Sequence, residues 1–465
     1  MSLTYSDLDS IVEARDAVES AYVAWEQFRR WTPDAVDRLV DIIARAVAPE
    51  ARRLGAMAVE ETRYGNVDDK ELKNLFNTVA VSDWLRTVRT LGVLWRDEVT
   101  RVAGIGEPMG VVAAIIPVTN PTATIIFKTL SAIKAGNAVV HAPHPRAAHC
   151  CAETARIMAE AAETAGAPRG LIQCLTGGDL AGTQELMRHR RTAVVMATGG
   201  SAMVRAAYSS GKPTLAVGPG NVPVYVDRSR SENLDEIADM LLSSKSFDYG
   251  TACVAEQAVI VDRPIADRLR HALRSAGGYF CTWREADALA DVLFQPNGAL
   301  TVDSVGQSPQ RLGELAGFQP PPDTRVLLAE LDTVGRNVPL SAEKLAPVLA
   351  FYVADGAEDG IRRAEEILQF GGLGHTAAVH AADPEVVTRF SRISAARILV
   401  DSPCLHGGIG WSCDIDPSFM LGTGTASGSI VSDNVTALHL INIKRVAYES
   451  RPWRSITDLL DERKS

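Results

Sequence analysis

Cys253 is a cysteine whose position in the sequence suits a nucleophile. It lies in KSFDYGTACVAEQAVIVD, where a helical pattern ends near Phe247, an irregular glycine-containing stretch follows, and an apolar strand begins near Ala258. A loop between regular elements can present a thiol to a cleft, and a thiolate is a strong nucleophile. The alternative is a buried apolar cysteine, the commonest fate of a free thiol. That alternative fits the other cysteines better, because they lie mostly inside expected helices and strands, with Cys404 in a loop as the exception.

Asn120 is a second polar residue in a position that suits chemistry. With Thr119 it follows the apolar run GVVAAIIPV, and Pro121 then begins the next expected helix, where a missing N–H costs nothing. The carboxyl ends of parallel strands are where open α/β sheets bind ligands. The Asn120 side chain can therefore face a ligand, or it can cap the following helix, which is the commoner role.

Glycines cluster beside apolar elements at three places, and a histidine follows the last of them. The clusters are Gly199 with Gly200, Gly218 with Gly220, and Gly371, Gly372 and Gly374. None has the G-x-G-x-x-G spacing, so the glycines alone do not establish nucleotide binding. His375 has the most loop-like setting of the nine histidines. Such a histidine is most often structural, but imidazole titrates near neutral pH and suits proton transfer.

Helices and strands alternate regularly around these residues. Helical spacing of apolar residues predicts helices at 6–28, 34–47 and 70–91. From Met109 to Gly218 strands and helices alternate strictly, and the strands read as continuous apolar runs, which is typical of a buried parallel sheet. A second alternating region runs from about 233 to 420. The pattern predicts two α/β domains with a cleft between them, the usual place for a cofactor to meet a substrate.

Composition narrows the classes of function. The chain has 465 residues, of which 46% are apolar, and a net charge of −10 that is dispersed along it. We therefore expect a globular protein that binds neither nucleic acid nor a membrane surface. The seven cysteines are scattered, so we expect no disulfide framework and no metal site, and a reducing compartment. The polar start of the chain predicts no secretory signal, hence a cytoplasmic location.

Several motifs together resemble one known family. They are EPMGVVAAIIPVTNPTATIIFKTLSAIKAGNAVVHAPHPRA, ATGGSAMVRAAYSSGKPTLAVGPGNVPV, KSFDYGTACVAEQ, EKLAPVLAFY, GGLGHTA and SDNVTALHLINIK. In this order they resemble the CoA-acylating aldehyde dehydrogenases, relatives of the aldehyde dehydrogenase half of bifunctional aldehyde–alcohol dehydrogenases. The resemblance runs from the first helices to about Lys444.

The resemblance implies a fold and a domain organisation. It implies an aldehyde dehydrogenase-like α/β fold with two doubly wound α/β domains, an interdomain cleft and a small oligomerisation hairpin. We expect a cofactor-binding domain at 1–226, with 94–108 in the hairpin, and a catalytic domain at 227–424 that carries Cys253. Residues 425–465 would supply an oligomerisation strand and a tail. The family further implies a homodimer or homotetramer, and being the cargo of a bacterial microcompartment is a further alternative.

The resemblance also assigns roles to residues. Cys253 matches the nucleophile, and Asn120 matches the amide that forms an oxyanion hole with a backbone N–H near Cys253. His375 matches the histidine of the acylating branch, and Glu343 matches the glutamate that holds the nicotinamide-side ribose. The cofactor-binding set that the resemblance implies is Thr119, Pro143, His144, Pro145, Gly199, Gly200, Gly218, Gly220 and Glu343.

Two departures from hydrolytic aldehyde dehydrogenases are informative. Where those enzymes have Glu-Leu-Gly-Gly, whose glutamate activates water, this chain has Val217-Gly218-Pro219-Gly220. Where they have the Lys-Pro-x-Glu that holds the adenosine ribose, this chain has Ala142-Pro143-His144-Pro145, which leaves NAD and NADP both open. Arg146 beside this segment could suit a phosphate.

The expected reaction is the reversible oxidation of a short-chain aldehyde, acetaldehyde or propanal, with NAD or NADP and coenzyme A to an acyl-CoA. It would pass through a thioacyl-Cys253 intermediate, and we expect the site to activate this thiol, because an ordinary cysteine is mostly protonated at neutral pH. The alternatives are the same chemistry on an anionic aldehyde (succinic semialdehyde or sulfoacetaldehyde), a hydrolytic aldehyde dehydrogenase, an acyl phosphate reductase, and a non-catalytic scaffold.

Overall fold

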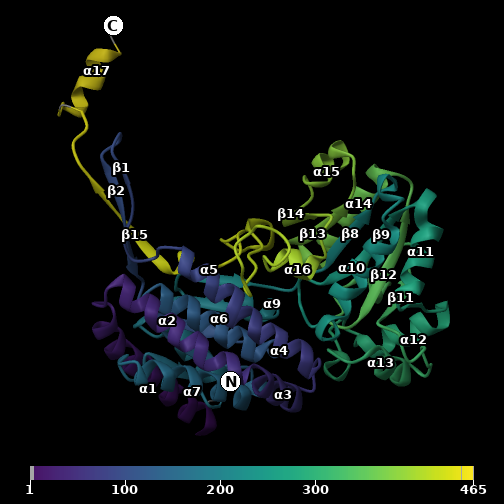
Figure 1. The fold of residues 1–465 in the computed structure, drawn as a ribbon, viewed down its shortest axis with the longest axis horizontal. Helices are drawn as coiled ribbons and strands as arrows, with labels where there is room; N and C mark the ends of the chain where they lie inside the picture. The colour runs from purple at the N-terminus through teal and green to yellow at the C-terminus, as the bar shows by residue number, and fades with distance from the viewer. Residues whose placement is uncertain (1–4, 178, 452, 464–465) are drawn as a thin grey trace.

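The structure, a computed structural model, describes residues 5–177, 179–451 and 453–463. It has two α/β bodies side by side and a narrow arm that projects from the first of them (Figure 1). The first body contains a five-stranded sheet in the order β5-β4-β3-β6-β7, with every neighbouring pair parallel. Its strands are β3 (Val111–Ile115), β4 (Ala138–Ala142), β5 (Ile172–Cys174), β6 (Thr192–Thr198) and β7 (Thr214–Val217).

Helices cover both faces of this sheet. α1 and α8 pack on one face, and α6 and α7 with α2 behind them pack on the other. Every residue of β3, β4 and α6 is buried, which explains why these segments read as nearly unbroken apolar runs. The helices of this body are α1 (Tyr5–Phe28), α2 (Pro33–Val47), α3 (Ala51–Thr62), α4 (Val67–Leu75), α5 (Ser82–Thr87), α6 (Pro121–Lys134), α7 (Ala148–Thr164), α8 (Leu180–Arg188) and α9 (Ser201–Tyr208).

Two helical segments differ from the sequence prediction. The stretch predicted as one helix over 70–91 is α4, a π-helical turn at Phe76–Val81 and α5, and it ends at Thr87 because Val88 is already extended. The helix α3 was not predicted. It buries a face of mostly small residues, among them Gly55 and Ala58, which gives little apolar periodicity.

The second body contains a seven-stranded sheet in the order β10-β11-β12-β9-β8-β13-β14, also parallel throughout. Alternate residues of β9 pack against α10 and α11 on one face and against α14 on the other. Its strands are β8 (Val222–Val226), β9 (Glu256–Asp262), β10 (Gly278–Phe280), β11 (Val326–Glu330), β12 (Val348–Ala354), β13 (Gly374–His380) and β14 (Ala395–Val400). Its helices are α10 (Leu234–Ser246), α11 (Ala266–Ser275), α12 (Trp283–Leu293), α13 (Pro309–Ala316), α14 (Ala357–Ile367), α15 (Pro384–Phe390) and α16 (Cys404–Gly408).

The boundary between the bodies lies earlier than the predicted residue 226. β8 pairs with β9 and β13 of the larger sheet, so the chain crosses over between Val217 and Val222. The end of the chain also divides differently from the prediction of 425–465, since Val431, Val435 and Leu440 pack into the core of the first body.

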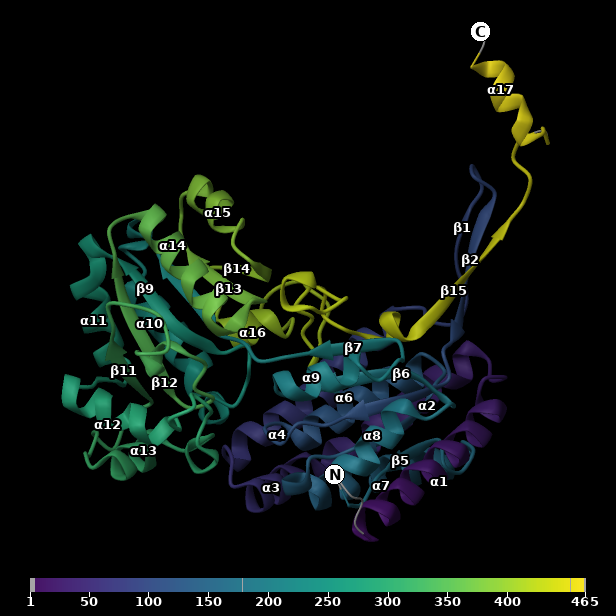
Figure 2. The same cartoon turned by 180° about the vertical axis from the view of Figure 1, so that it is seen from behind.

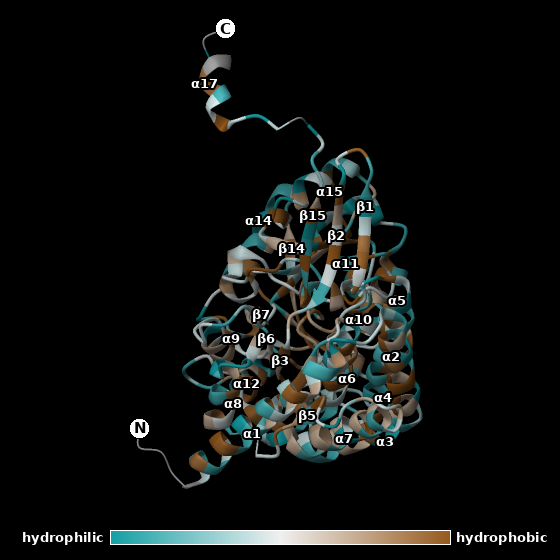
Figure 3. Cartoon of the chain, turned by 90° about the vertical axis from the view of Figure 1, so that its left-hand side faces the viewer, coloured by the Kyte–Doolittle hydropathy of each residue, from teal (hydrophilic) through white to brown (hydrophobic). Residues whose placement is uncertain are grey.

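The projecting arm is a three-stranded antiparallel sheet in the order β1-β2-β15 (Figure 2). β1 (Gly92–Asp97) and β2 (Val102–Pro108) form a hairpin that includes the predicted 94–108, and β15 (Ile441–Ala447) pairs along β2. Beyond β15 the short helix α17 (Leu459–Glu462) stands clear of both bodies (Figure 3). The last two residues of the tail lie outside the described part of the chain.

Candidate active site

The predicted cofactor-side residues gather at one edge of the first sheet. Thr119 and Asn120 follow β3, the segment 143–145 follows β4, Gly199 and Gly200 follow β6, and Gly218 and Gly220 follow β7. Because these strands are parallel, their carboxyl ends meet at the same edge, where α/β sheets bind ligands. This edge faces the second body, which supplies the remaining site residues.

Cys253 lies on the loop between a distorted helical turn (Phe247–Gly250) and β9, as the sequence predicted. The residues Asp248, Tyr249 and Gly250 have φ angles of 49°, 50° and 71°, a left-handed backbone that is rare outside glycine. A side chain at position 250 would collide with the Ala346 carbonyl oxygen. Non-glycine residues hold this conformation only where their surroundings fix it.

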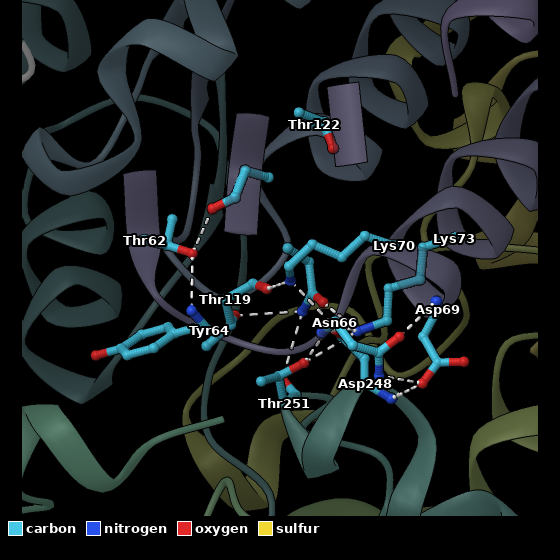
Figure 4. A network of polar contacts seen from close by, with 12 residues as sticks. Thr62, Tyr64, Asn66, Asp69, Lys70, Lys73, Thr119, Thr122, Asp248 and Thr251 are labelled. Carbon is cyan, nitrogen blue, oxygen red and sulfur yellow. Dashed lines mark hydrogen bonds and ion pairs between the residues drawn. The ribbon is translucent and has the colours of Figure 1, made fainter. Parts of the chain in front are cut away.

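Hydrogen bonds from the first body fix this turn through the buried Asp248 carboxylate (Figure 4). Its Oδ1 accepts the backbone N–H of Asn66 at 3.0 Å, and its Oδ2 accepts from the ammonium groups of Lys70 and Lys73 and, at 2.7 Å, from the Thr251 hydroxyl. Burial raises the pKa of Asp248, but the two lysines outweigh this effect and hold the pKa below its ordinary value. The network therefore joins the two bodies beside the loop that carries Cys253, which we call the catalytic loop because Cys253 is the predicted nucleophile.

Asn120 is the N-cap residue of α6, but its side chain makes no capping hydrogen bond, so the capping role that the sequence allowed is wrong for its side chain. Its Oδ1 accepts from the Lys73 ammonium at 2.6 Å. Its Nδ2 lies 3.2 Å from Thr119 Oγ1 and 3.4 Å from the carbonyl oxygen of Thr251, two residues before Cys253. The donor end of the amide is thus turned toward the catalytic loop, as an oxyanion hole requires.

Gly220 is the point where three predicted site residues meet. Its backbone N–H donates to Glu343 Oε1 at 3.0 Å. A methyl group at position 220 would lie 2.3 Å from the Cys253 carbonyl oxygen and 3.1 Å from Cγ of His375. Only glycine fits between these groups, so Cys253, Glu343 and His375 form one cluster.

The thiol of Cys253 is not activated in this state, contrary to the sequence expectation. Burial raises its pKa to about 12, the Glu343 carboxylate adds to the rise, and Arg397 and Lys73 oppose it only in part. Burial also raises the pKa of Glu343 to about 7, despite its hydrogen bond from Gly220. Both shifts have the same physical cause, since a low-dielectric environment disfavours an anion.

His375 is neutral and is a weaker base than an ordinary imidazole, which favours a hydrogen-bond donor role for it over proton transfer near pH 7. The imidazole is fully buried, burial lowers its pKa to about 3, and Arg397 adds to this. Its Nδ1 lies 3.0 Å from the Thr376 hydroxyl oxygen, which also accepts from Arg397. The Thr376 hydroxyl proton is then free to donate to Nδ1, which places the imidazole proton on Nε2. Nε2 is buried without a partner among the described residues, so it can donate to a bound group.

The remaining predicted cofactor residues lie in loops that can approach a phosphate or a ribose. Gly199 and Gly200 precede α9, and nothing lies within 4 Å of the space where a side chain of residue 200 would stand. A helix N-terminus open in this way suits a phosphate group. The ring nitrogen Nδ1 of His144 accepts the backbone N–H of Arg146. The Arg146 guanidinium donates to the Tyr64 hydroxyl and the Thr62 carbonyl, which uses two of its five N–H groups.

An apolar cavity of about 380 Å³ lies against the catalytic loop. Its walls include Phe76, Phe247, Leu405, Trp411 and Phe419. The side chains of Phe247, Leu405 and Ile409 also pack with those of Ala252 and Val254, the two neighbours of Cys253 in the sequence. The cavity is therefore placed to hold the hydrocarbon part of a substrate.

The residues that the sequence analysis missed are Lys70, Lys73, Asp248 and Arg397. Each is a charged residue that the fold buries, and each acts through a residue more than 100 positions away or in another element. The sequence offered one signal, the spacing of Lys70 and Lys73 on one face of a helix, which alone is typical of a solvated surface. In the described ranges no helix is long and apolar enough to cross a membrane, and no cluster of His, Cys, Asp and Glu could hold a metal ion.

Comparisons with known proteins agree with this architecture. The sequence pattern of the aldehyde dehydrogenase family matches residues 5–277, more than half of the chain. The chain is 40% identical over 442 residues to the aldehyde-alcohol dehydrogenase 2 of Entamoeba histolytica, a match that covers 92% of this chain and 51% of that protein. It thus spans about half the length of the first curated relatives that it matches.

Solved structures match over nearly their whole length. An acetylating aldehyde dehydrogenase from Geobacillus thermoglucosidasius is 47% identical, with a TM-score of 0.95 over 97% of this chain and all of that one. A Rhodopseudomonas palustris propionaldehyde dehydrogenase with bound propionyl-CoA is 27% identical, with a TM-score of 0.85 over 94% of both chains. On its family pattern, its two parallel sheets and its cysteine loop, this chain belongs to the aldehyde dehydrogenase family.

Proposed function

We propose that the protein is a CoA-acylating aldehyde dehydrogenase. It would convert an aldehyde, coenzyme A and NAD(P)+ to an acyl-CoA, NAD(P)H and a proton, reversibly, through a thioester on Cys253. The observation that carries this proposal is the cluster of Cys253, Asn120 and His375 around a segment, Val217–Gly220, that contains no carboxylate. The relatives whose printed names include acetylating activity or bound propionyl-CoA support the same reaction.

In the first half-reaction the Cys253 sulfur adds to the aldehyde carbon. The thiol must first lose its proton, and its raised pKa means that binding of substrates has to favour the thiolate. The developing oxyanion would accept from Asn120 Nδ2 and from a backbone N–H of the loop, and one such donor is worth roughly 3–4 kcal/mol in other enzymes. A bound nicotinamide supplies the hydride acceptor. Glu343 and the open turn at Gly200 are the groups of this chain that would hold the dinucleotide.

In the second half-reaction the CoA thiol attacks the thioester on Cys253. Exchange of an acyl group between two thiols is nearly thermoneutral, which makes the reaction reversible. Water would need a base, and Glu343, the carboxylate that raises the pKa of the thiol, is held by the Gly220 N–H and is half protonated near pH 7. The Nε2–H of His375 is a donor that can hold the thioester oxygen while the CoA thiol attacks.

The aldehyde is uncharged and short, of the acetaldehyde or propanal class. In the apolar cavity Lys73 is the lining residue with a cation, and its three N–H groups already donate to Asp248, Asn120 and Thr251. His406 also lines the cavity, and burial lowers its pKa, so it is neutral. An anionic aldehyde such as succinic semialdehyde or sulfoacetaldehyde would bury its charge there without a partner, at a large free-energy cost.

The test is a panel of aldehydes assayed for NAD(P)H formation with and without CoA. We expect turnover to need CoA and the product to be acyl-CoA, with propanal used at least ~100-fold better than succinic semialdehyde, since an unpaired buried charge costs several kcal/mol. The Cys253→Ser variant should lose more than about 90% of the rate, because serine has no accessible anion at neutral pH. Equal NADH production without CoA, accompanied by free acid, would restore the hydrolytic alternative.

The arm and the location belong to the same proposal. We infer a homodimer or homotetramer in which the arm of one copy pairs with a neighbour, since β15 has one edge paired with β2 and most of its residues exposed. Sedimentation of the full chain against a variant without residues 441–465 tests this.

We also propose that the protein works in the cytoplasm, and that encapsulation in a microcompartment would use the exposed Ile456 and Leu460 of the tail.

A further inference from the structure

Lys73 is a buried lysine whose three N–H groups all have acceptors. Its Nζ lies 2.6 Å from Asn120 Oδ1 and 3.0 Å from Thr251 Oγ1, and it forms an ion pair with Asp248. The side chain is 3% exposed, and it rises from α4 of the first body toward the catalytic loop of the second (Figure 4). An ammonium group has three donors and no acceptor, so this geometry uses its full capacity.

The contact with Lys73 decides which end of the Asn120 amide faces the catalytic loop. A carboxamide has an acceptor oxygen at one end and a donor nitrogen at the other, and the two ends are nearly equal in shape. Because an ammonium can only donate, the Asn120 oxygen has to face Lys73. The Nδ2 donor is then left on the side of Thr251 and the loop that carries Cys253. A cation on the oxygen also polarises the amide and strengthens its N–H as a donor.

We propose that Lys73 is a positioning residue for the oxyanion hole. It holds the Asn120 amide with its N–H toward the carbonyl oxygen that Cys253 attacks, and Asp248 holds Lys73 in place. The proposal rests on the proposed reaction and adds a residue that does not touch the substrate oxygen itself. It predicts that Lys73 acts on catalysis mainly through Asn120.

Lys70 offers a matched control on the same helix. It is 2% exposed, and its ammonium contacts the same Asp248 oxygen at 2.9 Å. Its second acceptor is the backbone carbonyl oxygen of Thr119 at 3.0 Å, and it donates no hydrogen bond to the Asn120 side chain. Removing either lysine therefore removes one buried ion pair with Asp248, but only the loss of Lys73 frees the amide.

The experiment compares Lys73→Met and Lys70→Met in the full chain. We expect Lys73→Met to lower kcat for CoA-dependent aldehyde oxidation about 100-fold, the usual effect of losing one oxyanion donor, with KM for the aldehyde changed less than about threefold. Lys70→Met should lower kcat less than about fivefold. Melting curves should show similar losses of stability for both variants, because the same carboxylate loses one partner in each. Equal losses of kcat in the two variants would overturn the proposal.

A double-mutant cycle then tests whether Lys73 acts through Asn120. In the Asn120→Ala background, adding Lys73→Met should change kcat by less than about threefold, since there is no amide left to orient. A further 100-fold loss would mean that Lys73 acts independently and would contradict the proposal. If Met at position 73 prevents folding, the same cycle with Lys73→Gln against Lys70→Gln carries the test.

The rate of Cys253 alkylation by iodoacetamide separates orientation from a simple effect of charge. Orientation of Asn120 predicts that Lys73→Met slows alkylation no more than about threefold while kcat falls about 100-fold. An equal loss of both rates would show that Lys73 only stabilises the thiolate, and the proposal would fail. If the wild-type protein itself shows no CoA-dependent oxidation of any aldehyde, it is the proposed function that fails.

Discussion

The catalytic loop has a buried carboxylate, Asp248, on one side and a partly buried carboxylate, Glu343, on the other, and the two are stabilised very differently. Asp248 receives four hydrogen bonds, two of them from lysines, and its pKa lies below the ordinary value. Glu343 receives one backbone N–H, and its pKa rises to about 7. On the Glu343 side, Nε2 of His375 and Nζ of Lys245 are also buried without partners among the described residues.

This difference indicates a structural role for the Asp248 side and a role in ligand binding for the Glu343 side. A buried charge whose hydrogen bonds are all made stays ionised and holds its neighbours in one geometry. A buried group with unmade bonds is costly in the free protein and gains a partner only when a ligand arrives. The Asp248 side therefore fixes the loop and Asn120, whereas the proposed function would use the Glu343 side to bind the cofactor and the thioester.

Asp248→Asn should have the largest effect, because it breaks the stabilised side. The variant leaves Lys70 and Lys73 buried without their counter-charge, and breaking a buried pair in this way costs about 3–5 kcal/mol. Denaturant unfolding followed by fluorescence measures the loss. The exposed pair between Arg263 and Asp355 is the control, since Asp355→Asn should cost less than about 1 kcal/mol. Equal costs would mean that burial of the Asp248 network contributes nothing.

His375→Ala tests the Glu343 side of the loop by its effect on reaction rates. The first burst of NADH should fall less than about threefold, whereas steady-state turnover should fall at least about tenfold, because the Nε2–H is needed only when CoA attacks the thioester. Rapid mixing with and without CoA separates the two phases. His375→Asn retains an N–H donor and should recover part of the loss. A parallel fall of burst and turnover, or a lower melting temperature alone, would make His375 a packing residue.

Glu343→Gln should change how the free energy of unfolding depends on pH. A carboxyl with a native pKa of about 7 binds more protons in the folded protein than in the unfolded chain between about pH 4.3 and 7. This contribution to stability is complete below about pH 4.3 and is lost as the pH rises through 7. The variant should remove roughly 1 kcal/mol of that decline, a figure discounted because the Glu343 side chain is partly exposed to solvent. Unfolding curves at pH 5 and pH 8 measure it.

The same variant should make Cys253 more reactive. Glu343 is one cause of the raised pKa of the thiol, so removing its charge lowers that pKa. Alkylation by iodoacetamide at pH 8 should then become faster by a few-fold. A slower reaction would mean that Glu343 draws the proton from the thiol and does not merely repel the thiolate.

Much of the fold followed from local patterns, and the parts that did not have physical reasons. The strands β3 and β4 were readable because parallel strands buried on both faces leave unbroken apolar runs. The sequence pattern does not predict the helix α3, because α3 buries Gly55 and Ala58 at positions where a helix usually buries large apolar side chains. The boundary was misplaced because β8 continues the strand pattern of the first body and differs from it only in its partners.

In the site, the residue types were predictable and their protonation was not. Cys253, Asn120 and His375 were singled out by position and by resemblance, and the structure brings them to one place. The pKa values of Cys253 and His375 depend on burial and on Arg397, a residue that local sequence cannot connect to them. The orientation of Asn120 depends in the same way on Lys73, which lies 47 positions earlier.

The ion pairs between Asp248 and the two lysines connect two bodies that have separate cores. Activity should therefore depend on the contact between the two bodies. A low concentration of denaturant that separates the two bodies by the length of one hydrogen bond would leave both sheets folded. It would nevertheless release the amide of Asn120 and the turn before Cys253 together. Inactivation should therefore precede the loss of secondary structure, because the contacts between the two bodies are lost while both sheets are still folded.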